Sequence, residues 1–182
     1  MADALLRSTG WPIKPISHHP SNRSSPMNTD IITEDRVITI DYGMSVDDMI
    51  DAGAYYSSAG YITAKRFPVQ GEGVVQYQAK IFHFDRRISS EDAVAAIKAD
   101  DRQNPWAPAK IEGLLAYGAK NTEEQRQYPI VGLGSVVKVR GDHSVPCLYR
   151  YDAERSLDLG LWNDSWDGFC RFLAVRKLSS AA

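Results

Sequence analysis

The side-chain types of a hydrolytic triad stand next to one another at Asp142-His143-Ser144. A triad needs an acid, a base and a nucleophile that converge from separate elements of the fold. Consecutive residues of one short turn point in different directions and cannot form that relay. We therefore interpret this segment as a solvated turn and predict no nucleophile there.

A second candidate for chemistry is His83, which shares one face of an expected strand with Asp85. Residues two positions apart on a strand point to the same side, so the imidazole and the carboxylate could form an acid–base pair. A half-buried histidine on a strand more often satisfies its hydrogen bonds locally. We keep a small enzyme using His83 and Asp85 as an alternative function, and we assign no catalytic residue.

Metal and cofactor sites are not predicted. A zinc site needs three or four clustered ligands, whereas the chain has four histidines, two of them in the first thirty residues, and two separated cysteines. The Gly-x-Gly segments at 71–73 and 132–134 neither open a helix nor carry the lysine of a phosphate-binding loop. A turn and a strand bulge are expected at these two positions.

The clearest indication of function is the segment 162–168, which places two tryptophans and two carboxylates between expected strands. Aromatic and polar side chains on a loop are suited to contact a partner. The alternative is a core Trp162 followed by a polar turn. The predicted contact residues belong to this loop and to the strand at 145–151, and they are Tyr149, Tyr151, Trp162, Asn163, Asp164, Trp166 and Asp167.

Three segments have the pattern of helices. Ser45 and Asp48 have the spacing of a capping box, and apolar residues follow at helical intervals. Ser89, three residues before Asp92, is the best helix start in the chain. A further helix is expected after Pro108, because proline suits the first turn of a helix.

Strands are expected at 36–42, 75–81, 145–151, 157–162 and 169–175, where β-branched or alternating apolar residues occur. In the second of these, odd-numbered residues are predicted to face the core and even-numbered residues to face water. In the last, odd and even residues face opposite sides. The pattern predicts an α+β fold, in which two helices lie against a mostly antiparallel sheet and the C-terminal strands form a meander.

Length and charge exclude several classes of protein. The 182 residues, 43% of them hydrophobic, fit a single domain over 31–178 with a substantial core. A net charge of −2 argues against a dedicated nucleic-acid-binding protein. No segment approaches the ~20 apolar residues that cross a bilayer. The expected partner is therefore an unknown protein or a small ligand, and neither a nucleic acid nor a membrane.

The first thirty residues differ from the rest of the chain. They contain four prolines and a run rich in serine, and they show no hydrophobic periodicity. Such a segment cannot bury enough apolar surface to offset the entropy of ordering it. We expect 1–30 to be a disordered leader, with translated sequence upstream of a start at Met27 as the alternative.

The two cysteines, Cys147 and Cys170, are too few for a disulfide scaffold. Both lie in apolar surroundings, which favours buried free thiols in a reducing cytoplasm. A bridge between them would require their strands to be neighbours.

Motifs spread over 36–177 resemble those of a family of small uncharacterised proteins from bacteria of the candidate phyla. That family implies no established activity. The matching segments are Phe67-Pro68, His83-Phe84-Asp85-Arg86, Ser89-Ser90-Glu91, Leu114-Leu115-Ala116, Gln125-Arg126, Pro129-Ile130-Val131, Leu133-Gly134-Ser135, Val145-Pro146 and Arg171-Phe172-Leu173-Ala174-Val175-Arg176-Lys177.

The order of elements also resembles the C-type-lectin-like fold of formylglycine-generating enzymes and of retroelement-diversified binding proteins. In that fold the C-terminal strands and loops display the ligand-contacting residues. The chain lacks the Gly-Asn-Val-Trp-Glu-Trp motif of the enzyme branch, and Cys147 and Cys170 lack the close spacing of its copper-binding pair. The resemblance therefore implies a binding scaffold.

The sequence thus favours a cytoplasmic, non-catalytic binding or interaction module that presents C-terminal loops. Two alternatives stay open. One is the small enzyme described above, and the other is an accessory protein of a mobile element or phage.

Overall fold

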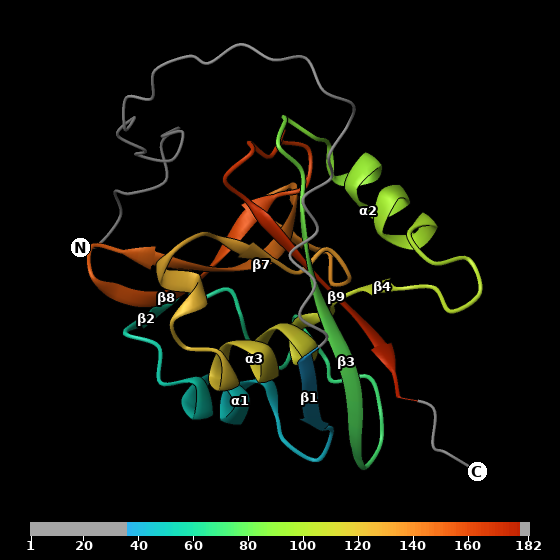
Figure 1. Cartoon of the computed structure of the whole chain (residues 1–182). Coiled ribbons are helices and arrows are strands. Elements are labelled where there is room, and N and C mark those ends of the chain that lie inside the picture. The colour runs from blue at the N-terminus through green and yellow to red at the C-terminus, as the bar shows by residue number, and fades with distance from the viewer. Residues whose placement is uncertain (1–35, 179–182) are drawn as a thin grey trace, which may run out of the picture.

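The computed structural model describes residues 36–178, so the predicted leader lies outside the described residues. Nine strands of this part of the chain join one sheet in the order β1-β3-β9-β5-β7-β8-β2, with β4 paired to β9 and β6 paired to β7 (Figure 1). Most pairs are antiparallel, and three α-helices accompany the sheet, which confirms the predicted α+β class. The strands are β1 (Arg36–Asp41), β2 (Ser57–Ser58), β3 (Val74–His83), β4 (Ala107–Pro108), β5 (Ile130–Val131), β6 (Val137–Val139), β7 (Asp142–Tyr151), β8 (Glu154–Leu161) and β9 (Arg171–Lys177).

Two helices begin at their predicted capping residues, Ser45 and Ser89. The prediction that Pro108 stands in the first turn of the third helix is wrong, because Pro108 pairs with Ala174 in β4 and that helix begins at Ile111. In α1 (Val46–Gly53) the Ser45 hydroxyl accepts the Asp48 amide at 3.1 Å, and the Asp48 carboxylate accepts the Ser45 amide at 3.1 Å. These two bonds satisfy amides that the first turn leaves unpaired. The Ser45 hydroxyl also donates to the Asp48 carboxylate at 2.7 Å, and this bond, together with that of the Ser45 amide, holds the pKa of Asp48 below its usual value. The remaining helices are α2 (Ser90–Ala99), α3 (Ile111–Lys120) and a short 3-10 turn, η1 (Glu124–Arg126).

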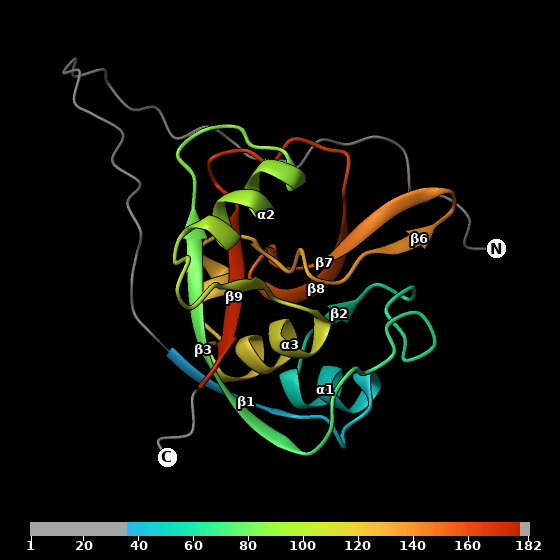
Figure 2. The same cartoon turned by 90° about the vertical axis from the view of Figure 1, so that its right-hand side faces the viewer.

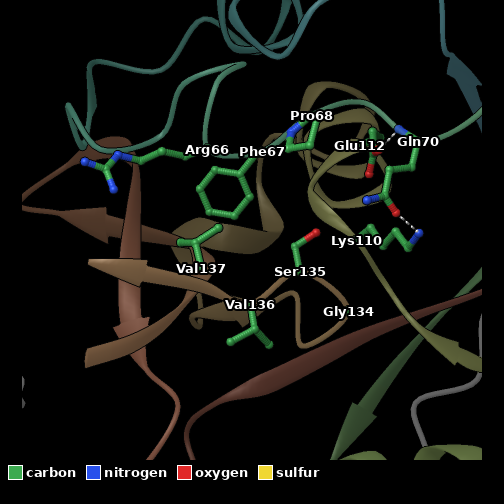
Figure 3. Close-up of a pocket in the computed structure, with 10 residues that line it drawn as sticks. All are labelled: Arg66, Phe67, Pro68, Gln70, Lys110, Glu112, Gly134, Ser135, Val136 and Val137. Carbon is green, nitrogen blue, oxygen red and sulfur yellow. Dashed lines mark hydrogen bonds between the residues drawn. The ribbon is translucent and has the colours of Figure 1, made fainter. Parts of the chain in front are cut away.

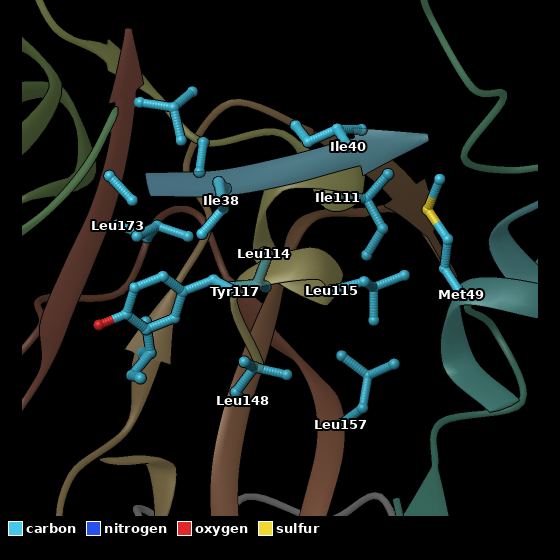
Figure 4. Packing of buried hydrophobic residues seen from close by; sticks show 14 of the residues in the cluster. Ile38, Ile40, Met49, Ile111, Leu114, Leu115, Tyr117, Leu148, Leu157 and Leu173 are labelled. Atoms are coloured by element: carbon cyan, nitrogen blue, oxygen red, sulfur yellow. The ribbon is translucent and has the colours of Figure 1, made fainter. Parts of the chain in front are cut away.

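Two hydrophobic clusters lie on opposite faces of the sheet. α1 and α3 cover one face, where Leu173 of β9 packs beside Leu114 of α3 (Figure 4). α2 covers the other face, where Phe172 of β9 belongs to the cluster that contains Ile97 (Figure 2). The predicted alternation of odd and even residues along the last strand is therefore confirmed.

The prediction of a C-terminal meander is wrong for β9. After β8 the chain crosses the sheet, and β9 pairs antiparallel with β3 and parallel with β5. Residues 172–175 are all buried, because side chains from both clusters cover them. A strand that is apolar on both faces takes a central position in a sheet rather than an edge.

The outer face of β3 is only partly exposed to water, contrary to prediction. Lys80 is buried, and its ammonium group forms an ion pair of 2.7 Å with Asp100 at the end of α2. Trp106 covers the same region, with its ring centre 5.6 Å from the Lys80 nitrogen. The segment between α2 and β4 thus closes over the second half of β3, while Gln76 on the first half stays exposed.

A buried arginine joins the two helices of the first face to β8. The guanidinium of Arg155 donates to the carbonyl oxygens of Gly53, at the end of α1, and Gly118, in the last turn of α3, at 2.6 and 2.7 Å. A third bond of 3.2 Å reaches Gln125, and the ring of Tyr55 lies 4.8 Å from the guanidinium carbon. Carbonyls at helix C-termini lack intrahelical donors, so one side chain fixes both ends.

Within residues 36–178, none of the helices has the length and apolar character required to cross a lipid bilayer.

Candidate functional site

The loop between β8 and β9 is anchored by Trp166. Its ring is buried and meets Phe172 edge-on at 6.1 Å, and its indole N–H donates to the Ser90 hydroxyl at 2.8 Å. Backbone hydrogen bonds in both directions also link it to Ile88. A side chain at Gly160 would collide with the Trp166 ring, since an added Cβ would lie 2.5 Å away. This predicted contact residue is therefore part of the core.

Unlike the buried Trp166, Trp162 and the loop tip lie at or near the surface. Trp162 is half-buried, its indole N–H donates to the Glu91 carboxylate, and its carbonyl oxygen accepts the Ser90 hydroxyl at 2.8 Å. The next two residues, Asn163 and Asp164, are exposed. The loop is thus fixed to the first turn of α2 while its tip faces solvent.

Asp167 turns the chain back toward β9. Its carboxylate accepts the Phe169 amide at 2.9 Å and lies 3.7 Å from the Cys170 sulfur. It is half-buried, whereas the ring of Phe169 is 53% exposed. Phe169 was not among the predicted contact residues, because the sequence places it at the start of an expected strand.

The two predicted tyrosines lie at the opposite end of the β7–β8 hairpin. Tyr151 pairs with Glu154 beside the hairpin turn, seven residue steps of ~3.3 Å from Leu161, which is roughly 23 Å of strand. Tyr151 is 59% exposed. Tyr149 is half-buried, and burial is the main cause that raises the pKa of its hydroxyl. The structure therefore does not bring the seven predicted residues onto one surface.

The candidate catalytic groups occupy unremarkable surroundings. His83 donates its Nε2 hydrogen to the Gly168 carbonyl oxygen at 2.8 Å, and Asp85 is exposed. Asp142 and His143 are exposed beside the β6–β7 turn, where Arg140 has a φ of 52°. The predicted turn is therefore wrong, because Asp142, His143 and Ser144 all belong to β7 and Ser144 is buried; only the expected exposure of the first two is confirmed. Among residues 36–178, no three side chains of metal-ligating type cluster together.

A pocket that sequence reasoning missed lies at the start of α3, with a volume of about 170 Å³ (Figure 3). Segments from three parts of the chain form it: the loop before β3, the beginning of α3, and the segment entering β6. Its lining residues are Arg66, Phe67, Pro68, Gln70, Lys110, Glu112, Gly134, Ser135, Val136 and Val137.

Hydrogen bonds hold the wall of this pocket in place. The Ser135 hydroxyl accepts the Ile111 amide at 2.9 Å and so caps α3 from another segment. The Gly134 amide donates to the Ala109 carbonyl oxygen at 2.9 Å. A Cβ at Gly134 would lie 2.3 Å from the Pro108 carbonyl oxygen, so only glycine fits this close approach.

The polar side of the pocket centres on Glu112. This carboxylate is 2% exposed, and its Oε1 accepts the Gln70 amide at 2.8 Å. The Gln70 side-chain oxygen accepts an N–H of Lys110 at 2.6 Å. The sequence offers no signal for this site, because a glutamate in the first turn of a helix usually faces solvent.

Two arginines pack on Tyr61 next to the pocket, and one of them, Arg66, is a lining residue. The guanidinium carbons of Arg66 and Arg140 each lie 5.5 Å from the ring centre of Tyr61, and Arg66 also donates to the Lys138 carbonyl oxygen at 3.4 Å. These contacts join the loop before β3 to the β6–β7 hairpin. Both segments thus frame the pocket as one unit.

Comparison of the chain with protein-family models, with curated protein sequences and with solved structures gives no match. The likeness to a family of candidate-phylum bacteria and the likeness to the C-type-lectin-like fold therefore stay predictions. The α+β class itself follows from the described strands and helices.

Proposed function

We propose that the protein is a non-catalytic binding module whose main contact surface is the tip of the β8–β9 loop. The observation that carries this proposal is the pair of hydrogen bonds between the Ser90 hydroxyl and the loop. One joins the hydroxyl to the indole N–H of Trp166, and the other joins it to the carbonyl oxygen of Trp162. A loop held at its base loses little conformational entropy when its tip binds a partner. The exposed tip residues are Asn163, Asp164 and Ser165, and the first two carry the predicted contact groups.

The surroundings of the tip support a mixed polar and apolar contact. Phe169 is 53% exposed, and Leu161 at the end of β8 is also exposed. Interfaces commonly combine an apolar or aromatic centre with a polar rim. Asn163 and Asp164 offer hydrogen-bonding groups in the same loop. Tyr149 and Tyr151 would belong to a separate contact at the far end of the hairpin.

A protein or a small ligand is the proposed partner class. The net charge of −2 argues against a nucleic acid. A cytoplasmic location suits the two free cysteines, since thiols stay reduced there. The enzyme alternative has less support, because the Nε2 hydrogen of His83 is bound to a backbone carbonyl.

Affinity capture with matched variants tests the proposal. The full chain is immobilised and exposed to extract of its native host, beside the double variant Asn163→Ala, Asp164→Ala. A control variant, Asp47→Ala with Glu72→Ala, removes two exposed groups elsewhere. We expect the wild type and the control to retain the same partner and the loop variant to lose it. Equal capture by all three, or no enrichment over bare resin, contradicts the proposal.

A further inference from the structure

The pocket at the start of α3 is lined by a carboxylate with few hydrogen-bond partners. Glu112 is almost fully buried, and within residues 36–178 its single hydrogen bond is the one from the Gln70 amide to Oε1. An ionised carboxylate can accept about four hydrogen bonds, so this one can accept more. No oxygen of Glu112 is among the fully enclosed side-chain atoms of residues 36–178 that lack a partner, so its second oxygen is accessible from outside the core. The second oxygen, Oε2, belongs to a residue that lines the pocket. A cationic donor in the pocket would complete its bonding.

A cation lies next to this carboxylate on the same wall. The Lys110 ammonium group gives one of its three N–H donors to Gln70. Its side chain is exposed, so the remaining donors can reach a ligand. Lys110 is also the residue before α3 and makes no side-chain cap to the helix. The polar wall therefore offers both an anion and a cation.

The facing wall carries the apolar side chains of the pocket together with Arg66. In Figure 3, Phe67 and Val137 lie on one side of the pocket, and Gln70 and Lys110 lie on the other. Val136 extends the apolar side and is 44% exposed. A ligand would therefore meet hydrocarbon beside Arg66 on one side and two opposite charges on the other.

From this arrangement we propose that the pocket binds a small ligand with the chemistry of a free amino acid. The ligand's ammonium group bonds to Glu112, its carboxylate bonds to Lys110, and its apolar side chain packs against Phe67, Val136 and Val137. The volume of about 170 Å³ lies below the ~300 Å³ at which typical drug-sized pockets begin, which suits an amino acid and excludes a nucleotide. This site is separate from the β8–β9 loop and goes beyond the binding function proposed there.

Isothermal titration of the full chain with each of the twenty amino acids tests the proposal. We expect saturable binding of at least one amino acid with an apolar side chain. For L-valine the matched probes are isobutylamine, which lacks the carboxylate, and 3-methylbutanoate, which lacks the amino group. Each should bind at least ~10-fold more weakly, because each loses a charge-assisted hydrogen bond. No saturable binding by any amino acid, or binding of either truncated probe as tight as that of L-valine, overturns the proposal.

Two variants locate the binding site. Glu112→Gln keeps an oxygen to accept the Gln70 amide but removes the charge, and Lys110→Ala removes an exposed side chain. Each should weaken amino-acid binding at least ~10-fold. The controls Glu72→Gln and Lys98→Ala change exposed residues outside the pocket and should bind like the wild type. Unchanged affinity in both pocket variants contradicts the assignment. Loss of binding in the Asn163→Ala, Asp164→Ala variant would likewise place the site elsewhere.

Discussion

Trp166 donates its indole N–H to the hydroxyl of Ser90 at 2.8 Å, across 76 positions of sequence. The same hydroxyl donates to the Trp162 carbonyl oxygen. One fully buried serine at the start of α2 therefore satisfies two groups of the β8–β9 loop. The loop keeps its shape because its base is bonded to a helix.

Ser90→Ala should destabilise the protein by about 1–3 kcal/mol, because it leaves the Trp166 indole N–H and the Trp162 carbonyl without this partner. Urea denaturation measures the free energy of unfolding. Ser165→Ala, an exposed change in the same loop, should stay within about 0.5 kcal/mol of the wild type. Equal effects of the two changes would show that the serine bond does not hold the loop.

Arg155→Met should cost about 3 kcal/mol of unfolding free energy, since the carbonyl oxygens of Gly53 and Gly118 lose a charged donor. Arg150→Met is the matched control. Arg150 faces Arg155 across the β7–β8 pair, but it is exposed. We expect it to change stability by less than about 0.5 kcal/mol. A similar loss from both changes would contradict the role assigned to Arg155.

Gly134→Ala should destabilise the protein by about 1–3 kcal/mol, the usual cost of overpacking. The new Cβ would meet the backbone of Pro108 and Ala109, which cannot turn aside as a side chain can. Gly60→Ala is the control, because no atom lies within 4 Å of its Cβ position. Thermal unfolding should show a lower Tm for Gly134→Ala than for Gly60→Ala. An unchanged Tm in Gly134→Ala would refute the close contact between Gly134 and the backbone of residues 108–109.

Cys147 and Cys170 should be unreactive in the folded protein. Burial raises the pKa of Cys147 well above its usual value and that of Cys170 to about 12, so neither forms much thiolate at pH 8. Thiolate at Cys170 should appear only as the pH rises toward that value. A thiol reagent at pH 8 should therefore modify neither cysteine natively and both in urea. Rapid native labelling would contradict this placement.

The same pair should not form a disulfide. β5 lies between β7 and β9, so the two cysteines flank a strand rather than each other. Two strand spacings amount to about 9–10 Å, beyond the ~7 Å that a disulfide can span between Cα atoms. Mass spectrometry after mild oxidation should find both thiols intact. This agrees with the sequence-based prediction of free buried thiols.

Local features of the fold could be predicted because they depend on nearby residues. The start of α1 follows from Ser45 and Asp48, whose bonds span three positions. The alternation along β9 follows from the period of two in a strand. Both predictions need only the chemistry of neighbouring side chains.

Other features depend on contacts between distant segments. The position of β9 between β3 and β5 requires both of its faces to be covered. The run of four apolar residues at 172–175, all of which are buried, could have indicated this. The burial of Lys80 depends on Asp100 and Trp106, and no local pattern shows this. The pocket around Glu112 joins three segments that are far apart in the sequence. For the same reason, alternation along β7 could not show that Tyr151 lies far from the β8–β9 loop.

Site-specific photo-crosslinking tests the proposed binding function most directly. A photoreactive amino acid replaces Asn163 at the loop tip in one sample and the exposed Glu72 in another, and both proteins are irradiated in extract of the native host. The binding function predicts one discrete crosslinked species from position 163 and none from position 72. Crosslinks of equal yield from both positions, or from neither, would contradict it.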